Sequence, residues 1–285
     1  MIHVKRDRVP APTVFSSARI NAERDRAQEF FSIRHSARAQ TRFDFKPEFW
    51  EQSRRDLYRL FRGKCAYCES RMKVTEAQLD HFRPTNNAKS FDGTTQRDYY
   101  WWLAYEWGNL YPACAECQRA KATLFPIEKG SERAGPGTDL RREHPLLLDP
   151  CDPEVIPDAH LAFLENGRVV AAARVEKNDL GYRRAEASID VFALNRKDLV
   201  QGRAKAIAET VAGCERIASR GRRLVAGTGA TMSQPDARVK KLLTPWYPHL
   251  AARRCCSPRL ARHGSLRQAD HRPGASAAIR QARAG

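Results

Sequence analysis

Two cysteine pairs decide how this chain folds: CAYC at residues 65–68 and CAEC at residues 114–117. Two residues between the cysteines of a pair place both sulfurs on one side of a turn, and two such turns complete a tetrahedral thiolate site for zinc. Because protein fills all four positions, we expect a structural zinc that joins two segments about fifty residues apart. The expected ligands are Cys65, Cys68, Cys114 and Cys117.

A chance pairing of cysteines and a dithiol redox motif are the alternatives to this zinc site. The matched spacing of the two pairs argues against chance. A redox motif needs one pair and a thioredoxin-like context of strand and helix, which the surrounding sequence does not suggest. The spacing therefore favours zinc.

Polar residues with catalytic potential lie between the two pairs, in LDHFRP at residues 79–84 and WGNL at residues 107–110. An imidazole with a pKa near neutrality can take a proton from water, and a neighbouring carboxylate can hold a divalent cation that stabilises charge on a phosphate. Asp80 and His81 are adjacent, so on an extended strand their side chains point to opposite faces. One of them must then be reached around a strand end or a bulge.

The sequence before the first cysteine pair predicts helices. Apolar groups recur near helical spacing from about residue 17 to residue 62, with a break near residues 45–47. Pro47 suits the first turn of the second helix, which is expected to span residues 47–61 and to end near Gly63. Residues 64–128 are expected to hold short strands and a last helix that begins near Cys114.

The sequence after residue 128 predicts a loop, a hairpin and a long helix. Residues 130–138 are rich in Gly, Ser, Pro and Arg and indicate the loop. Asn166-Gly167 between two apolar runs predicts the hairpin turn, and apolar spacing predicts the helix over residues 197–218. Beyond Pro245 the chain has few large apolar residues and many arginines, so we expect disorder there, with a solvated tail favoured over one that contacts nucleic acid.

Four segments follow from these patterns. They are an N-terminal helical segment (1–62), a zinc-braced core (63–128), a region of helix and hairpin that could face a partner (129–244), and a basic low-complexity tail (245–285).

Composition favours a globular protein with a polyanionic partner. The 285 residues are 42% hydrophobic, which is enough for one substantial domain or two small ones. The 50 Lys and Arg residues against 33 Asp and Glu residues leave a net charge of +17, which would attract nucleic acid in a salt-dependent manner. Much of this excess lies near the C-terminus, so the charge alone is also compatible with an ordinary basic protein.

The sequence gives no sign of a membrane span or a signal peptide. No window approaches ~18 consecutive apolar residues, and the first residues, MIHVKRD, lack an apolar core. We therefore expect a cytoplasmic protein without a membrane partner. The cytosol keeps most thiols reduced, so the eight cysteines are expected to be thiols or metal ligands.

The order Cys-x-x-Cys, Asp-His-x-x-Pro, Asn-Leu, Cys-x-x-Cys resembles the HNH endonucleases, whose ββα-metal core binds one catalytic divalent ion and often has a separate four-cysteine zinc. More narrowly, the chain looks like the HNH subunits of retron and Septu-type anti-phage systems, a resemblance that covers about residues 45–205. Its motifs are CAYCE (65–69), LDHFRP (79–84), YWWLAYEWGNL (100–110), CQRAK (117–121), LLDPC (147–151) and VFALNR (191–196).

The resemblance implies an α+β fold, with an HNH ββα-metal nuclease core and a structural four-cysteine zinc site embedded in a mainly helical domain. It implies that His81 is the general base, that Asp80 binds a catalytic Mg²⁺ or Mn²⁺ ion, and that Asn109 braces the loop bearing the base. Gln118 takes the last position of the triad, where the family usually has His or Asn. Either a shifted Gln118 or water completes the ion's ligands, or the site is weakened, because Mg²⁺ tolerates little geometric error.

Two further sets of residues have a functional and a structural interpretation. Arg83, Arg119 and Lys121 could bind flanking phosphates or could be ordinary surface charges. The aromatic residues at positions 99–107 could stack on bases, but core packing is the favoured interpretation, since a small metal-braced fold lacks aliphatic mass.

The sequence thus predicts a metal-dependent HNH endonuclease that hydrolyses DNA or RNA, the effector of a retron or Septu-type defence system. The resemblance implies an ABC/SMC-like ATPase subunit as partner, and a retron nucleic acid could join the complex. Residues 191–203 and the N-terminal helices are candidates for the partner-facing surface, although an apolar helical stripe more often belongs to a core. The alternative is a catalytically inactive, zinc-dependent nucleic-acid-binding or adaptor subunit, which needs the four cysteines but not His81.

Overall fold

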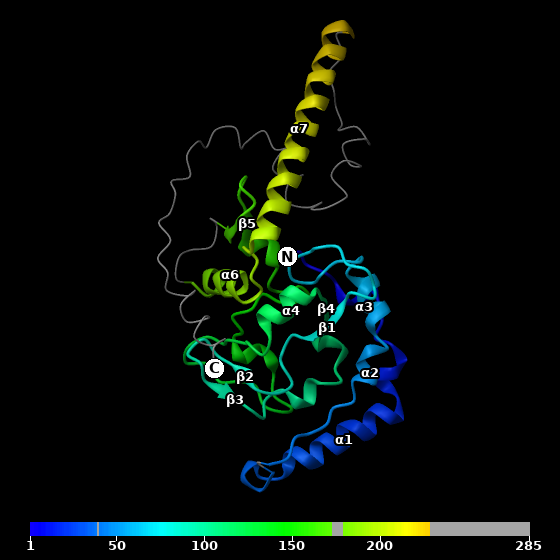
Figure 1. The fold of residues 1–285 in the computed structure, drawn as a ribbon, viewed down its shortest axis with the longest axis vertical. Helices are drawn as coiled ribbons and strands as arrows, with labels where there is room; N and C mark the ends of the chain where they lie inside the picture. Colours follow the sequence, from blue (N-terminus) through cyan, green and yellow to red (C-terminus); the bar gives the residue numbers. More distant parts are fainter. Residues whose placement is uncertain (39, 173–178, 229–285) are drawn as a thin grey trace. The chain divides into compact units, whose positions relative to one another are not determined.

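The computed structural model describes residues 1–38, 40–172 and 179–228. Within them the helices are α1 (Ala18–Ser32), α2 (Pro47–Glu51), α3 (Arg54–Leu60), α4 (Ala115–Lys121), α5 (Pro157–His160), α6 (Leu180–Val191) and α7 (Lys197–Thr228) (Figure 1). The strands are β1 (Gln78–His81), β2 (Ala88–Lys89), β3 (Thr95–Gln96), β4 (Leu110–Ala113), β5 (Leu161–Phe163) and β6 (Val169–Ala171). Helices and two-stranded sheets are mixed, in keeping with the expected α+β class. The predicted tail at residues 245–285 lies outside the described residues.

The chain divides into two compact units. Residues 1–161 and 171–194 belong to the first unit, and residues 162–170 with the described part of Asn195–Arg272 belong to the second. None of the described helices is long and apolar enough to cross a membrane.

A strand–strand–helix unit lies in the first compact unit; it begins within the cysteine-bracketed segment (Cys65–Cys117) and ends just beyond it. β1 runs antiparallel to β4, with Gln78 opposite Ala113 and His81 opposite Leu110. The chain passes from β4 into α4 through Cys114, the N-cap residue of α4, and α4 packs against β1 (Figure 1). All four residues of β4 are buried, so this strand fixes β1 on one side while α4 contacts it from another. The predicted helix beginning near Cys114 is confirmed.

The second predicted helix is broken where a single helix was expected. Pro47 occupies the first turn of α2 as predicted, but α2 ends at Glu51 and α3 begins at Arg54. The cause lies at Ser53, whose hydroxyl donates a hydrogen bond to the Trp50 carbonyl oxygen at 2.6 Å. A buried serine hydroxyl that bonds to the carbonyl oxygen three residues earlier competes with the regular helical hydrogen bonds.

The hairpin and the last helix match their predictions in position but not in length. β5 pairs with β6 around Asn166-Gly167, and the loop predicted at residues 130–138 contains neither helix nor strand. Gly167 has a φ of +82°, and a Cβ there would lie 2.0 Å from the Val200 carbonyl oxygen of α7, so the position requires glycine. α7 begins at Lys197 as expected but continues to Thr228 instead of ending at residue 218.

The aromatic run packs into the core of the first unit, as the favoured interpretation held. Tyr100, Trp101 and Tyr105 are buried, while Trp102 and Trp107 are half-buried. Trp101 stacks on Phe31 of α1 with ring centroids 4.8 Å apart. These rings therefore fill space between α1 and the segment that carries the cysteine pairs.

Candidate metal centre and active site

The four predicted zinc ligands come together in one buried cluster. The sulfur atoms of Cys65, Cys68, Cys114 and Cys117 all lie within 4.8 Å of one another, and those of Cys68 and Cys114 are 3.7 Å apart. Four thiolates around one zinc at about 2.3 Å would be about 3.8 Å apart, so the cluster fits a tetrahedral site. Burial raises the pKa of the Cys65 thiol, and hydrogen bonding from Cys114 lowers that of Cys68. A cation would hold all four as thiolates.

Backbone hydrogen bonds build the first cysteine turn and tie it to the sheet. The amide of Cys65 donates to Ser70, and the amide of Glu69, at a φ of +66°, donates back to Cys65. The amide of Ala66 donates to the Pro112 carbonyl oxygen of β4 at 2.8 Å. The first ligand pair is therefore anchored to the strand that leads into the second pair.

The end of α6 covers the cysteine cluster. The Cys117 thiol donates to the Phe192 carbonyl oxygen at 3.6 Å, and the Phe192 ring stacks on Tyr67 with centroids 4.0 Å apart. Val191, Phe192 and Leu194 are buried. This part of the block at residues 191–203 therefore belongs to the core, and a partner would not reach these three side chains.

His81, the predicted base, ends β1 and has a defined tautomer. Its Nε2 atom lies 2.9 Å from the Ala104 carbonyl oxygen. A carbonyl oxygen accepts but cannot donate, so Nε2 carries the proton and Nδ1 keeps its lone pair. Burial lowers the pKa of His81, so the imidazole is neutral at neutral pH. The half-buried ring also meets the edge of Trp50, with centroids 4.9 Å apart.

The Asp80 side chain points to the opposite face of β1 from the His81 ring, because successive side chains alternate along a strand. On that face its carboxylate is hydrogen-bonded and ion-paired. Its Oδ2 atom accepts a hydrogen bond from the Tyr67 hydroxyl at 2.5 Å and lies 3.2 Å from Nζ of Lys121. The Lys121 ammonium is buried and also donates to the His81 carbonyl oxygen at 2.7 Å. Asp80 and Lys121 thus hold α4 against β1.

The residues expected to bind a catalytic Mg²⁺ or Mn²⁺ ion do not form a site for it as they lie. Asp80 is paired with an ammonium, and the Gln118 amide nitrogen is directed to the Leu79 carbonyl oxygen at 3.3 Å. Hard cations need several oxygen ligands. Within the described ranges, the cysteine cluster is the one group of three or more His, Cys, Asp or Glu side chains that could hold a metal.

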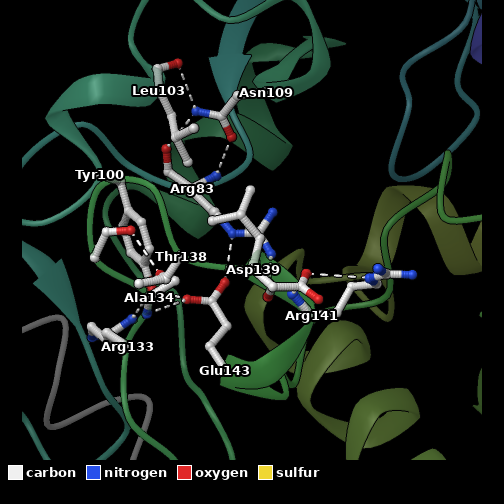
Figure 2. Close-up of polar contacts among 12 residues, drawn as sticks. Arg83, Tyr100, Leu103, Asn109, Arg133, Ala134, Thr138, Asp139, Arg141 and Glu143 are labelled. Carbon is white, nitrogen blue, oxygen red and sulfur yellow. Dashed lines mark hydrogen bonds and ion pairs between the residues drawn. The ribbon is translucent and has the colours of Figure 1, made fainter.

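Asn109 fixes the backbone just beyond His81, in the position that the sequence suggested for a brace. Its side-chain oxygen accepts from the Arg83 amide at 2.8 Å, and its side-chain nitrogen donates to the carbonyl oxygens of Arg83 at 2.9 Å and Leu103 at 3.2 Å (Figure 2). The Asn109 carbonyl oxygen also accepts from the Phe82 amide at 2.9 Å. The Asn109 side chain therefore holds the turn after β1 through both its oxygen and its nitrogen.

The three cations expected near phosphates lie in different environments. Arg119 on α4 is exposed. Lys121 is enclosed with Asp80, and the Arg83 guanidinium donates to Glu143 at 2.5 Å and is 13% exposed. Arg119 is therefore the one of these three that a phosphate could reach.

Two residues that contact this site were not singled out in the sequence. Tyr67 was visible as a residue between two cysteines, but nothing local connected it with Asp80. Glu143 lies in DLRRE at residues 139–143, a charged stretch without helical or strand periodicity. A buried carboxylate in such a stretch has no signal in a single sequence, because its partners come from distant segments.

Comparison with known proteins identifies two related proteins, although no family model matches the chain. Over 169 residues, or 58% of this chain, it is 38% identical to Septu protein PtuB of Bacillus mycoides (strain KBAB4). Over 157 residues, or 54% of this chain, it is 36% identical to Septu protein PtuA of the same strain. The matched regions make up 54% of PtuB and 20% of PtuA. The chain is therefore homologous to PtuB and to part of PtuA over about half of its own length.

Proposed function

We propose that this protein is an HNH-type endonuclease, a component of a Septu-type anti-phage defence system that hydrolyses phosphodiester bonds. The proposal rests on the surroundings of His81. Its neutral imidazole lies at the end of β1, β1 packs against α4, and Asn109 holds the turn that follows. The adjacent four-cysteine cluster and the homology to two Septu proteins support the same assignment.

The setting of His81 suits a general base. Because Nε2 is held by the Ala104 carbonyl oxygen, Nδ1 is the atom that would take a proton from the attacking water. Asn109 limits movement of the backbone that carries the ring, and Arg119 would contact a neighbouring phosphate. The Mg²⁺ or Mn²⁺ ion that the HNH resemblance implies would stabilise charge on the phosphate, but Asp80 and Gln118 would first have to leave their present partners.

We further propose that the protein acts with a second subunit, an ATPase of the ABC/SMC-like type, with which a retron nucleic acid could associate. The similarity to two Septu proteins supports membership of a system with more than one protein, while the ATPase type of the partner comes from the motif resemblance alone. Residues 191, 192 and 194 are buried, so the partner surface would have to use other residues.

The test is cleavage of plasmid DNA, single-stranded DNA and total RNA by wild type, His81→Ala and His35→Ala, each with Mg²⁺, Mn²⁺ or EDTA. His35 is an exposed histidine and serves as the matched control. Cutting by wild type and His35→Ala but not by folded, zinc-loaded His81→Ala would support the proposed base. Equal cutting by all three proteins would exclude His81 as the base.

A nucleic-acid-binding subunit without catalysis is the second candidate. The engagement of Asp80 with Lys121, together with Gln118 in place of the usual His or Asn, favours it. Tight binding of nucleic acid without cutting under all three conditions, with and without an ATPase subunit, would establish this function instead.

A further inference from the structure

A buried carboxylate outside the cysteine-bracketed segment contacts the surroundings of His81. The Glu143 side chain is 0% exposed and belongs to a short 3₁₀ helix at Leu140–Glu143. Its Oε1 atom accepts from Nε of Arg83 at 2.5 Å, and its Oε2 atom accepts from the Tyr100 hydroxyl at 2.7 Å and the Ala134 amide at 3.2 Å (Figure 2). Both carboxylate oxygens are thus occupied by donors from separate segments.

The first of these donors fixes the turn that follows β1. Arg83 lies two residues after His81, and Asn109 already holds its backbone amide and carbonyl. Glu143 holds its side chain as well, in a largely buried ion pair. Removing one member of such a pair leaves an uncompensated charge, so the pair resists local movement. This interaction gives Arg83 a role in holding the turn.

The second donor fixes the segment that holds the His81 ring. Tyr100 is buried and directly precedes the 3₁₀ helix at Trp101–Leu103, which leads to Ala104. The Ala104 carbonyl oxygen in turn accepts from Nε2 of His81. Burial raises the pKa of Tyr100, so its hydroxyl stays protonated and continues to donate to Glu143. Arg133 supports this arm by donating to the same hydroxyl at 3.1 Å.

We propose that Glu143 is a positioning residue for His81, because it joins the turn that directly follows His81 to the segment that holds its ring. This inference rests on the proposed function, which gives the position of His81 its catalytic meaning. Glu143 acts through Arg83 and Tyr100 and is not expected to touch nucleic acid.

The test compares Glu143→Gln with wild type in the full-length, zinc-loaded protein. Glutamine keeps the shape but loses the charge, and its amide nitrogen cannot accept from Tyr100 or Ala134. We expect kcat for cleavage to fall on the order of 10-fold to 10²-fold with little change in KM, because small misplacements of a catalytic group cost rates of this size. The NMR signals of the His81 ring should shift, and the Arg83 amide should exchange faster.

Asp98→Asn is the matched control. Asp98 pairs with the buried Arg38 through two hydrogen bonds of 2.8 and 3.1 Å, in an ion pair that shares no residue with the Glu143 contacts. Its loss should lower stability while leaving kcat and the His81 signals unchanged. If Glu143→Gln and Asp98→Asn both leave kcat and the His81 signals at their wild-type values, Glu143 does not position His81.

Two further arms keep the test decisive. If Glu143→Gln does not fold, Arg83→Met with Glu143→Leu removes both charges and should fold, because replacing a whole buried pair is tolerated far better than breaking it. Wild-type kcat in that double variant would overturn the proposal. If the wild type cuts no substrate with or without an ATPase subunit, the proposed function fails, and the His81 signals and the Arg83 amide exchange still decide the structural claim.

Discussion

Replacing Lys121 with methionine tests the ion pair that joins α4 to β1. Lys121 is 0% exposed, and its ammonium lies 3.2 Å from Asp80 and 2.7 Å from the His81 carbonyl oxygen. Methionine fills most of the volume but supplies neither charge nor donor. The variant leaves a buried carboxylate whose remaining hydrogen-bond donor is the Tyr67 hydroxyl.

The expected loss in the free energy of unfolding is about 3–5 kcal/mol, the usual cost of removing one partner from a buried ion pair. Part of it should return in the double variant Lys121→Met with Asp80→Asn. Asparagine is neutral, and its oxygen can still accept from Tyr67. A residual cost of about 1–3 kcal/mol should remain, because the His81 carbonyl oxygen loses its charged donor.

Urea unfolding of the zinc-saturated protein measures these differences. Lys73→Met is the control, since Lys73 is 82% exposed and its ion pair with Glu76 should contribute about 0–1 kcal/mol. If Lys121→Met costs no more than Lys73→Met, the Lys121 ammonium is not withdrawn from water and the pairing does not hold the helix. A double variant as unstable as Lys121→Met alone would likewise refute the electrostatic explanation.

Three other changes have defined outcomes. Cys117→Ser should reduce bound zinc, measured by elemental analysis, and lower the Tm, since structural zinc contributes directly to folding; full zinc content would contradict the four-cysteine site. Gly167→Ala should destabilise the hairpin by about 1–3 kcal/mol or more in urea unfolding, because of its positive φ and the nearby Val200 carbonyl oxygen, and an unchanged midpoint would contradict this packing. Burial raises the pKa of Cys151 to about 12. The rate of Cys151 alkylation, measured by mass spectrometry, should therefore be slow at pH 8 and rise about tenfold per pH unit below that pKa. A rate that reaches a plateau near pH 9 would contradict the raised pKa.

Features that depend on local chemistry could be predicted from the sequence. The spacing of the four cysteines predicted the cluster, and the structure brings their sulfurs within 4.8 Å. Pro47 at a helix start and Asn166-Gly167 at a hairpin turn each follow from the backbone conformations that these residues favour, and both are confirmed. Such rules need no knowledge of distant residues.

Features that depend on distant partners could not be predicted. Asp80 meets Lys121 across 41 positions, and Arg83 meets Glu143 across 60, so neither pairing leaves a periodic signal. The sequence suggested Lys121 and Arg83 as phosphate contacts because sequence alone does not show whether a Lys or Arg near a candidate site is exposed or buried.

Helix α6 was missed for a related reason. Several of its buried positions are small residues, among them Ala185, Ala187 and Ser188. These residues weaken the apolar stripe that a periodicity argument needs. Its packing at the cysteine cluster depends on Phe192, which follows the helix.

The contacts around β1 connect the metal centre with the candidate base. Tyr67 lies between two cysteines of the cluster, donates its hydroxyl hydrogen to Asp80 and stacks on Phe192. Asp80 pairs with Lys121, which in turn holds the His81 carbonyl oxygen. A change at the cysteine cluster, such as loss of a bound metal, would therefore reach His81 through these buried contacts. A zinc ion bound at the cysteine cluster would therefore help to position the candidate base as well as to fold the chain, because a base must keep its geometry to act.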